Sequence, residues 1–133
     1  HQAPTFDAAL AQRLGADQRG MRQYVLVILR TGPYTPTTSE ERARLFEGHF
    51  SNMRRLSDEG KLLTAGPIGQ NENQYRGIFV FDVASVEDAR ALVATDPTVA
   101  NGVFVADFYP WYGSAAMRDL PAIHRRIEPP AEE

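Results

Sequence analysis

Two segments of the chain are apolar at nearly every position, and they constrain the fold more than any other feature of the sequence. Residues 24–29 read YVLVIL, and residues 76–83 read RGIFVFDV. Because successive side chains of a strand point to opposite faces, such runs predict strands that are buried on both sides of a sheet. The fold must therefore supply cover for both faces of that sheet.

A long amphipathic helix is predicted between these two strands. Thr38 and Glu41 have the spacing of a capping box, and Gly60 is suited to follow the last helical residue. The apolar positions between them follow the spacing of one helix face: Leu45, Phe46, His49, Phe50, Met53 and Leu56. His49 is polar and shares this face, so we expect its ring to point toward the sheet.

The remaining elements complete the order β-α-β-β-α-β. Residues 61–65 and 103–109 predict two further strands, and Ser85 is expected to cap a second helix that ends at Asp96-Pro97. This order predicts an α+β fold of the ferredoxin-like type, in which two helices cover one face of a four-stranded antiparallel sheet.

The chain is expected to hold one central domain over residues 22–112. An N-terminal helical extension (1–21) and a C-terminal extension with a tail (113–133) flank it. Two helices cover one face of the sheet, whereas the strands are apolar on both, and monomers rarely expose so large an apolar patch. We therefore expect a homodimer in which two sheets pack face to face. Partial cover by the N-terminal helix is the alternative.

Composition limits the possible partners. The 133 residues include 14 Lys and Arg against 17 Asp and Glu, and the net charge of −3 disfavours binding to nucleic acid. The chain has no cysteine, which excludes thiolate nucleophiles and cysteine-ligated metals. No apolar run approaches the ~20 residues of a membrane span. We therefore expect neither a nucleic-acid partner nor a membrane partner.

His49 and Asp96 are the candidate catalytic residues. His49 lies on one predicted helix and Asp96 at the end of the other, and both helices lie on the same face of the predicted sheet, so the two side chains can meet in the cleft between them. A carboxylate that holds one ring nitrogen leaves the other as a general base or acid. The structural alternatives are a core histidine bonded to a backbone carbonyl, and an aspartate that only starts a turn before proline.

Other side chains are candidates for binding a small-molecule ligand. Gly66 and Pro67 are expected to form a turn that lets a substrate approach the backbone, and Arg76 and Tyr109 are candidate substrate-binding residues. Further pocket candidates are Arg30, Tyr75, Trp111 and Tyr112. For the aromatic residues, packing in the core or in a dimer contact is the competing interpretation.

The three histidines lack the spacing of metal ligands, so we expect neither a metal nor a cofactor. A histidine at the N-terminus of a mature chain would be able to chelate copper, so copper binding by His1 is the alternative. His124 is expected on the surface of a terminal helix. No nucleophile motif of the G-x-S-x-G type is present, which argues against covalent hydrolysis.

A set of these residues resembles the YCII-related family of the dimeric α/β-barrel superfamily. The resemblance rests on His49, Leu56, the stretch EGKLLTAGP (59–67), Asp96-Pro97 and Gly102-Val103, and it covers about residues 22–112. It implies a ferredoxin-like fold, a sheet-to-sheet dimer and a His49–Asp96 active site. Related superfamily members carry out lactone isomerisation, dehydrochlorination and monooxygenation without metals. The terminal segments resemble a subgroup with export signals, which favours a periplasmic or secreted location over the cytoplasm.

The functional expectation is a cofactor-independent isomerase or lyase, similar to a dehydrochlorinase, in which His49 and Asp96 transfer a proton on a small organic substrate. The alternative is a non-catalytic module that binds a small ligand or a partner and uses His49 as a hydrogen-bonding anchor. A third interpretation treats both residues as details of helix packing.

Overall fold

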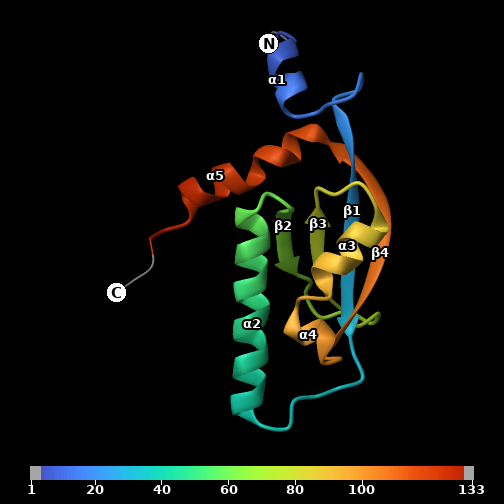
Figure 1. Ribbon diagram of the computed structural model, residues 1–133, viewed down its shortest axis with the longest axis vertical. Coiled ribbons are helices and arrows are strands. Elements are labelled where there is room, and N and C mark those ends of the chain that lie inside the picture. Colours follow the sequence, from blue (N-terminus) through green and yellow to red (C-terminus); the bar gives the residue numbers. More distant parts are fainter. Residues whose placement is uncertain (1–3, 131–133) are drawn as a thin grey trace.

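A four-stranded antiparallel sheet carries helices on one face in the computed structural model, which describes residues 4–130 (Figure 1). The strand order is β2-β3-β1-β4. The strands are β1 (Met21–Thr31), β2 (Leu62–Pro67), β3 (Tyr75–Phe81) and β4 (Phe104–Ser114). This arrangement confirms the predicted α+β fold of the ferredoxin-like type.

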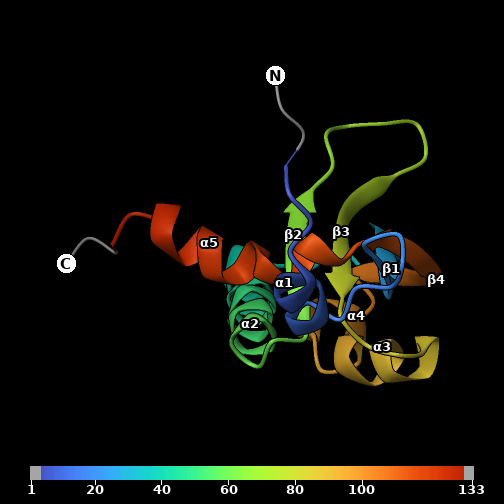
Figure 2. The same cartoon turned by 90° about the horizontal axis from the view of Figure 1, so that it is seen from above.

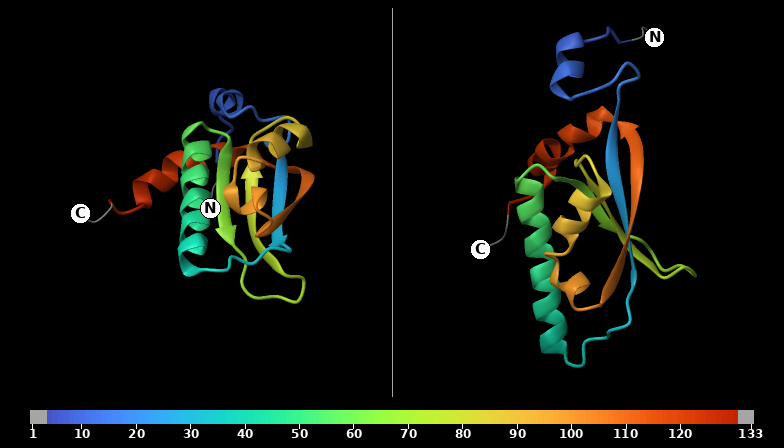
Figure 3. Two further views of the ribbon diagram at one scale, coloured as in Figure 1. Left: turned by 60° about the horizontal axis from the view of Figure 1, so that its bottom comes forward. Right: turned by 45° about the vertical axis from the view of Figure 1, so that its right-hand side comes forward.

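Three helices lie on one side of the sheet, as the edge-on view in Figure 3 shows. They are α2 (Ser39–Asp58), α3 (Val86–Val93) and α4 (Pro97–Ala100). The predicted caps are confirmed, because the Thr38 side chain accepts from the Glu41 amide and the Ser85 side chain accepts from the Asp88 amide. Gly60 has a φ of 77°, the left-handed conformation expected of the residue after a helix end.

β1 and β4 are both longer than the sequence predicts. They pair along 11 residues each, from Met21 opposite Ser114 to Thr31 opposite Phe104. The segment after Tyr109 contains proline and aromatic residues, and its sequence does not show that β4 continues through it. Pro110 is tolerated there because β4 is an edge strand, which does not need every backbone amide for pairing.

The prediction that the second helix ends at Asp96-Pro97 is wrong in its position. α3 ends at Val93, and Asp96 instead caps the short helix α4, with its side chain accepting from the Thr98 amide. Proline is compatible with the first helical position, since no intrahelical hydrogen bond is lost there. The Asp96-Pro97 pair therefore begins a helix that the sequence analysis did not anticipate.

The two faces of the sheet are covered differently. Val25, Val27 and Leu29 point toward the helices and form the main core with Phe79 and Phe81. On the opposite face, Tyr24, Leu63 and Val80 are buried beneath Met117 of the C-terminal extension. That extension consists of the 3-10 helix η1 (Ala115–Asp119) and helix α5 (Leu120–Ile127). The rest of this face, including Leu26, Ile28 and Tyr109, stays partly or largely exposed.

The two terminal extensions meet at one end of the sheet. The N-terminal helix α1 (Ala8–Arg13) buries none of its residues, so the alternative that it covers the second sheet face is wrong. Arg13 instead forms two parallel hydrogen bonds with Asp119. The buried Asp82 carboxylate accepts from both Arg22 and Arg118, and thereby connects β1, the residue that follows β3, and η1.

Within residues 4–130, no helix has the length and hydropathy that crossing a membrane requires.

Candidate active site

The candidate site lies where α4 meets the inner face of α2. His49 is buried on that face, in keeping with the apolar stripe that contains it. The neighbouring Gly48 explains why α4 comes so close. A Cβ atom at this position would lie 2.6 Å from Cγ of Pro97. A glycine in the middle of a predicted helix beside a candidate histidine is the sequence signal for this contact, and the sequence analysis did not use it.

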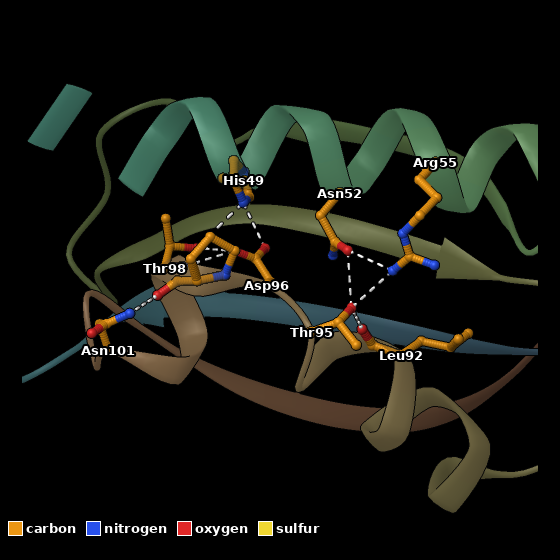
Figure 4. Close-up of polar contacts among 9 residues, drawn as sticks. His49, Asn52, Arg55, Leu92, Thr95, Asp96, Thr98 and Asn101 are labelled. Carbon is orange, nitrogen blue, oxygen red and sulfur yellow. Dashed lines mark hydrogen bonds and ion pairs between the residues drawn. The ribbon is translucent and has the colours of Figure 1, made fainter. Parts of the chain in front are cut away.

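The structure brings the His49 and Asp96 side chains into direct contact. Nδ1 of His49 lies 2.6 Å from Oδ2 of Asp96, and the two side chains are 9% and 1% exposed (Figure 4). Both residues lie on the same face of the sheet, as predicted from the sequence. The contact is therefore a buried histidine–carboxylate pair.

Thr98 occupies the other oxygen of the Asp96 carboxylate. Its backbone amide lies 2.9 Å and its hydroxyl 2.6 Å from Oδ1 of Asp96, and the side chain is fully buried. The hydroxyl oxygen also lies 3.3 Å from Nδ1 of His49. Thr98 thus leaves Oδ2 of the carboxylate directed at the imidazole. Thr98 was not among the residues predicted from the sequence, although a hydroxyl two residues after a candidate carboxylate is a recognisable signal.

The Asp96 carboxyl group is held in its ionised form. Burial alone would raise its pKa, but the hydrogen bonds from His49 and Thr98 together outweigh burial, and the pKa of Asp96 lies below its ordinary value. An ionised carboxylate only accepts hydrogen bonds, so Nδ1 of His49 carries the donated proton. In the neutral ring, Nε2 is then the unprotonated nitrogen.

Aromatic rings surround the imidazole on its other sides. The ring centroids of Phe50, Phe46, Phe104 and Phe79 lie 5.2, 5.8, 5.8 and 6.1 Å from that of His49. Nε2 makes no hydrogen bond to any residue between 4 and 130. Phe50 is 55% exposed, so one side of this aromatic group faces solvent. A basic nitrogen with no protein partner therefore lies among apolar rings.

A second polar cluster fixes the segment just before Asp96. The Thr95 hydroxyl lies 2.9 Å from Oδ1 of Asn52, and the Arg55 guanidinium donates to both Asn52 and Thr95 (Figure 4). Asn52 and Arg55 lie on α2, one and two turns beyond His49. Asp96 is thus anchored to α2 on both sides, by Thr95 before it and by Pro97 against Gly48 after it.

The structure does not bring the predicted substrate-binding residues to this pair. Gly66 and Pro67 are paired strand residues, opposite Ile78 and Gly77, so the prediction that they form a turn is wrong. Arg76 is exposed in β3 at a pairing irregularity between β1 and β3. Tyr109 pairs with Leu26 and so lies on the sheet face opposite α2.

The secondary pocket candidates have partners of their own. Arg30 bonds to Asp107, Tyr112 bonds to Asp17, and the Trp111 ring lies 5.9 Å from that of Tyr24. Tyr75 pairs opposite Arg30. These contacts support the packing interpretation for the side chains concerned.

The other two histidines lie away from the pair. His124 is exposed on α5, and His1 lies outside the described residues. In the part of the chain that the structure describes, no group of three or more histidine, cysteine, aspartate or glutamate side chains is placed to hold a metal ion.

Comparison with known proteins identifies the family. The model of the YCII-related domain matches residues 25–111. Two proteins named YciI, from Escherichia coli O6:H1 and Shigella flexneri, are each 35% identical over 72 residues, which is 49% of this chain and 74% of each relative. The chain belongs to the YCII-related family.

Among solved structures, the chain is similar to 5-chloro-2-hydroxyhydroquinone dehydrochlorinase (TftG) from Burkholderia phenoliruptrix AC1100, in complex with 2,5-dihydroxybenzoquinone. The TM-score is 0.46 and the sequence identity 18%, over 65% of this chain and 92% of that one.

Proposed function

We propose that the protein is an enzyme that transfers protons on a small organic molecule without a cofactor, with His49 as the general base and acid and Asp96 as the residue that orients it. The observation that carries this proposal is the 2.6 Å contact between Nδ1 of His49 and the buried Asp96 carboxylate. A histidine whose Nδ1 donates to a carboxylate presents an unprotonated Nε2 in its neutral form, which is the form a general base requires.

The proposed reaction begins with removal of a proton from an activated C–H bond by Nε2 of His49. The imidazolium that forms carries its positive charge beside the Asp96 carboxylate, which stabilises it. In an isomerisation, His49 returns the proton to a different atom of the substrate. In an elimination, the electron pair of the C–H bond forms a double bond while the leaving group departs with the electron pair of its own bond. His49 then gives the proton to the departed group or to water. Either outcome fits an isomerase or a lyase of the dehydrochlorinase type.

The four phenylalanine rings favour a flat, mostly apolar substrate. Aromatic side chains pack well against planar molecules and exclude water, which strengthens the polar contact made by the nitrogen. Lactones and chlorinated hydroquinones combine such a shape with an acidic C–H or O–H group. They are the first compounds to test.

Limited access to His49 favours the alternative function. Its side chain is only 9% exposed, which suits a hydrogen-bonding anchor in a non-catalytic ligand-binding module. Turnover separates the two functions, because an anchor binds a ligand without changing it.

The experiment measures product formation by wild type and by His49→Gln over a panel of lactones and chlorinated hydroquinones. Glutamine keeps a polar side chain of similar length but cannot act as a base. Circular dichroism checks that the variant is folded. We expect wild type to convert at least one compound and H49Q to lose at least ~100-fold in kcat, the usual scale of general base catalysis. Equal rates for the two proteins on a converted compound would reject the proposal.

We also propose that the protein forms a homodimer through the sheet face opposite α2. Leu26, Ile28 and Tyr109 lie on the part of this face that η1 leaves uncovered. Burying such a surface against a second copy would remove its apolar side chains from water. Analytical ultracentrifugation at micromolar concentration should give twice the 14.8 kDa chain mass. A particle of the single-chain mass would contradict the dimer.

A further inference from the structure

We infer that the space beneath α5 is a binding site for a small amphipathic carboxylate, separate from the His49–Asp96 pair. A cavity of about 530 Å³ lies between the C-terminal half of α2, the strand β2 and α5. Figure 2 shows α5 leaving the body of the protein beside α2. Neither His49 nor Asp96 lines this cavity. The inference therefore does not rest on the proposed enzymatic function.

The walls of this cavity are mainly apolar. Each of the three elements contributes: Met53 from α2, Leu62, Leu63 and Ala65 from β2, and Leu120, Ile123 and Ile127 from α5. Yet Ile123 and Ile127 are 51% and 71% exposed. The amphipathic helix α5 thus directs apolar side chains toward α2 and β2 but leaves them partly exposed to solvent. A ligand with an apolar body would remove these side chains from water, which favours binding.

The polar side chains of the lining that can donate hydrogen bonds are Arg54, Ser57, Thr64, His124 and Arg125, against the two carboxylates Asp58 and Glu128. Arg54, Ser57 and Thr64 make no side-chain hydrogen bond or ion pair within residues 4–130. Asp58 is already paired with Arg125 at 3.8 Å, which leaves Glu128 as the acidic side chain without such a pair among the described residues. Arg54 and Ser57 are three residues apart on α2 and so share a helix face, and with Thr64 of β2 they offer donors to a carboxylate, which accepts several hydrogen bonds at once.

The edge of the sheet adds further donors. β2 pairs with β3 alone, so the backbone groups along its other edge are not used by the sheet. α5 contacts β2, and both elements line the cavity. The family match ends at residue 111, before α5 begins. The site therefore combines α2 and β2 of the family's domain with a helix that lies outside it.

The test uses the full chain and three probes with the same eight-carbon body: octanoate, octanol and octylammonium. Isothermal titration calorimetry measures affinity, and chemical-shift changes in ¹H–¹⁵N spectra locate the site. We expect octanoate to bind most tightly and octylammonium most weakly. The largest shifts should fall on β2, α5 and the end of α2. No binding of octanoate, or shifts away from these elements, would overturn the inference.

Two variants and a matched control sharpen the test. Arg54→Gln should weaken octanoate binding about tenfold while leaving octanol unchanged, because a charge-assisted hydrogen bond is lost. Ile123→Ser combined with Ile127→Ser should weaken both probes, and the fold should persist because both side chains are exposed. Arg44→Gln is the control, since Arg44 is exposed on α2 and does not line the cavity. Equal effects of R54Q and R44Q would contradict the site.

Discussion

The Asp96 carboxylate reaches Nδ1 of His49 across 47 residues of sequence, at 2.6 Å. The contact depends on two local features that place α4 against α2. Gly48 leaves room for Pro97, and Thr98 holds the carboxylate oxygen that does not face the ring. Substitutions at Gly48 and Thr98 should therefore change the environment of His49 while leaving its own side chain in place.

Replacing Thr98 with valine should weaken the pair while keeping its shape. Valine lacks the hydroxyl that donates to Oδ1 of Asp96, so the buried carboxylate loses one of its donors. We expect the free energy of unfolding to fall by about 1–3 kcal/mol. We also expect the pKa of Asp96 to rise, because a bond that favours its charged form is gone. Urea unfolding and carboxyl ¹³C shifts measure the two effects.

The control for this change is Thr95→Val. The Thr95 hydroxyl is exposed and bonds to Asn52 rather than to Asp96. Because Thr95 makes no hydrogen bond to the carboxylate, this variant should change the pKa of Asp96 less than Thr98→Val does. Identical effects of both variants would show that Thr98 has no specific role.

Replacing Gly48 with alanine should move α4 away from α2. The added Cβ would meet Cγ of Pro97 at 2.6 Å, which is too close for carbon atoms. Alanine favours an isolated helix by about 1 kcal/mol over glycine, so a net loss of stability would have to come from this clash. We expect thermal unfolding at a lower temperature and a changed ring resonance of His49. Glu47→Ala, one position earlier on the same helix, is the comparison and should leave the His49 resonance in place.

The stability of the protein at acidic pH should depend on Asp96. The pKa of Asp96 is lower in the folded chain than in the unfolded chain. Its contribution to stability is therefore fully present above the unfolded pKa of about 4 and is lost as the pH falls through the lower, folded value. Wild type should lose stability over this window, and Asp96→Asn should lose less. Denaturation of both proteins between pH 6 and pH 2.5 measures the difference. Parallel curves would count against an ionised, stabilising Asp96.

Replacing Asp82 with asparagine should loosen the two terminal extensions together. The buried Asp82 carboxylate accepts from Arg22 and Arg118, and Arg118 also donates to the backbone carbonyl of Arg13. We expect a loss of about 1–3 kcal/mol and faster proteolysis of both ends. Asp58→Asn removes an exposed pair and should change stability by less than about 1 kcal/mol. Faster cleavage at one end alone would contradict the coupling.

The sequence predicts much of this molecule, because its strongest signals are local. The caps at Thr38 and Ser85 and the doubly apolar strands are short-range patterns, and they lead to the correct element order. The same patterns place His49 and Asp96 on one face of the sheet. Their contact also depends on the position of α4, and a helix of four residues that begins at Pro97 is too short to give a sequence pattern that predicts it.

Other features depend on tertiary contacts that no local pattern encodes. Strand pairing with β1 extends β4 through Pro110, and this pairing places Tyr109 on the face away from His49. Met117 covers one end of that face because the buried Asp82 holds Arg118 beside it. Location in the periplasm or outside the cell stays a prediction.

The tautomer of His49 tests the central claim most directly. Long-range ¹H–¹⁵N spectra of the neutral ring distinguish a proton on Nδ1 from a proton on Nε2. If Asp96 orients His49 as a general base, the proton lies on Nδ1 and Nε2 is bare. A proton on Nε2 would leave no base facing the aromatic rings, and it would contradict the proposed role of the pair.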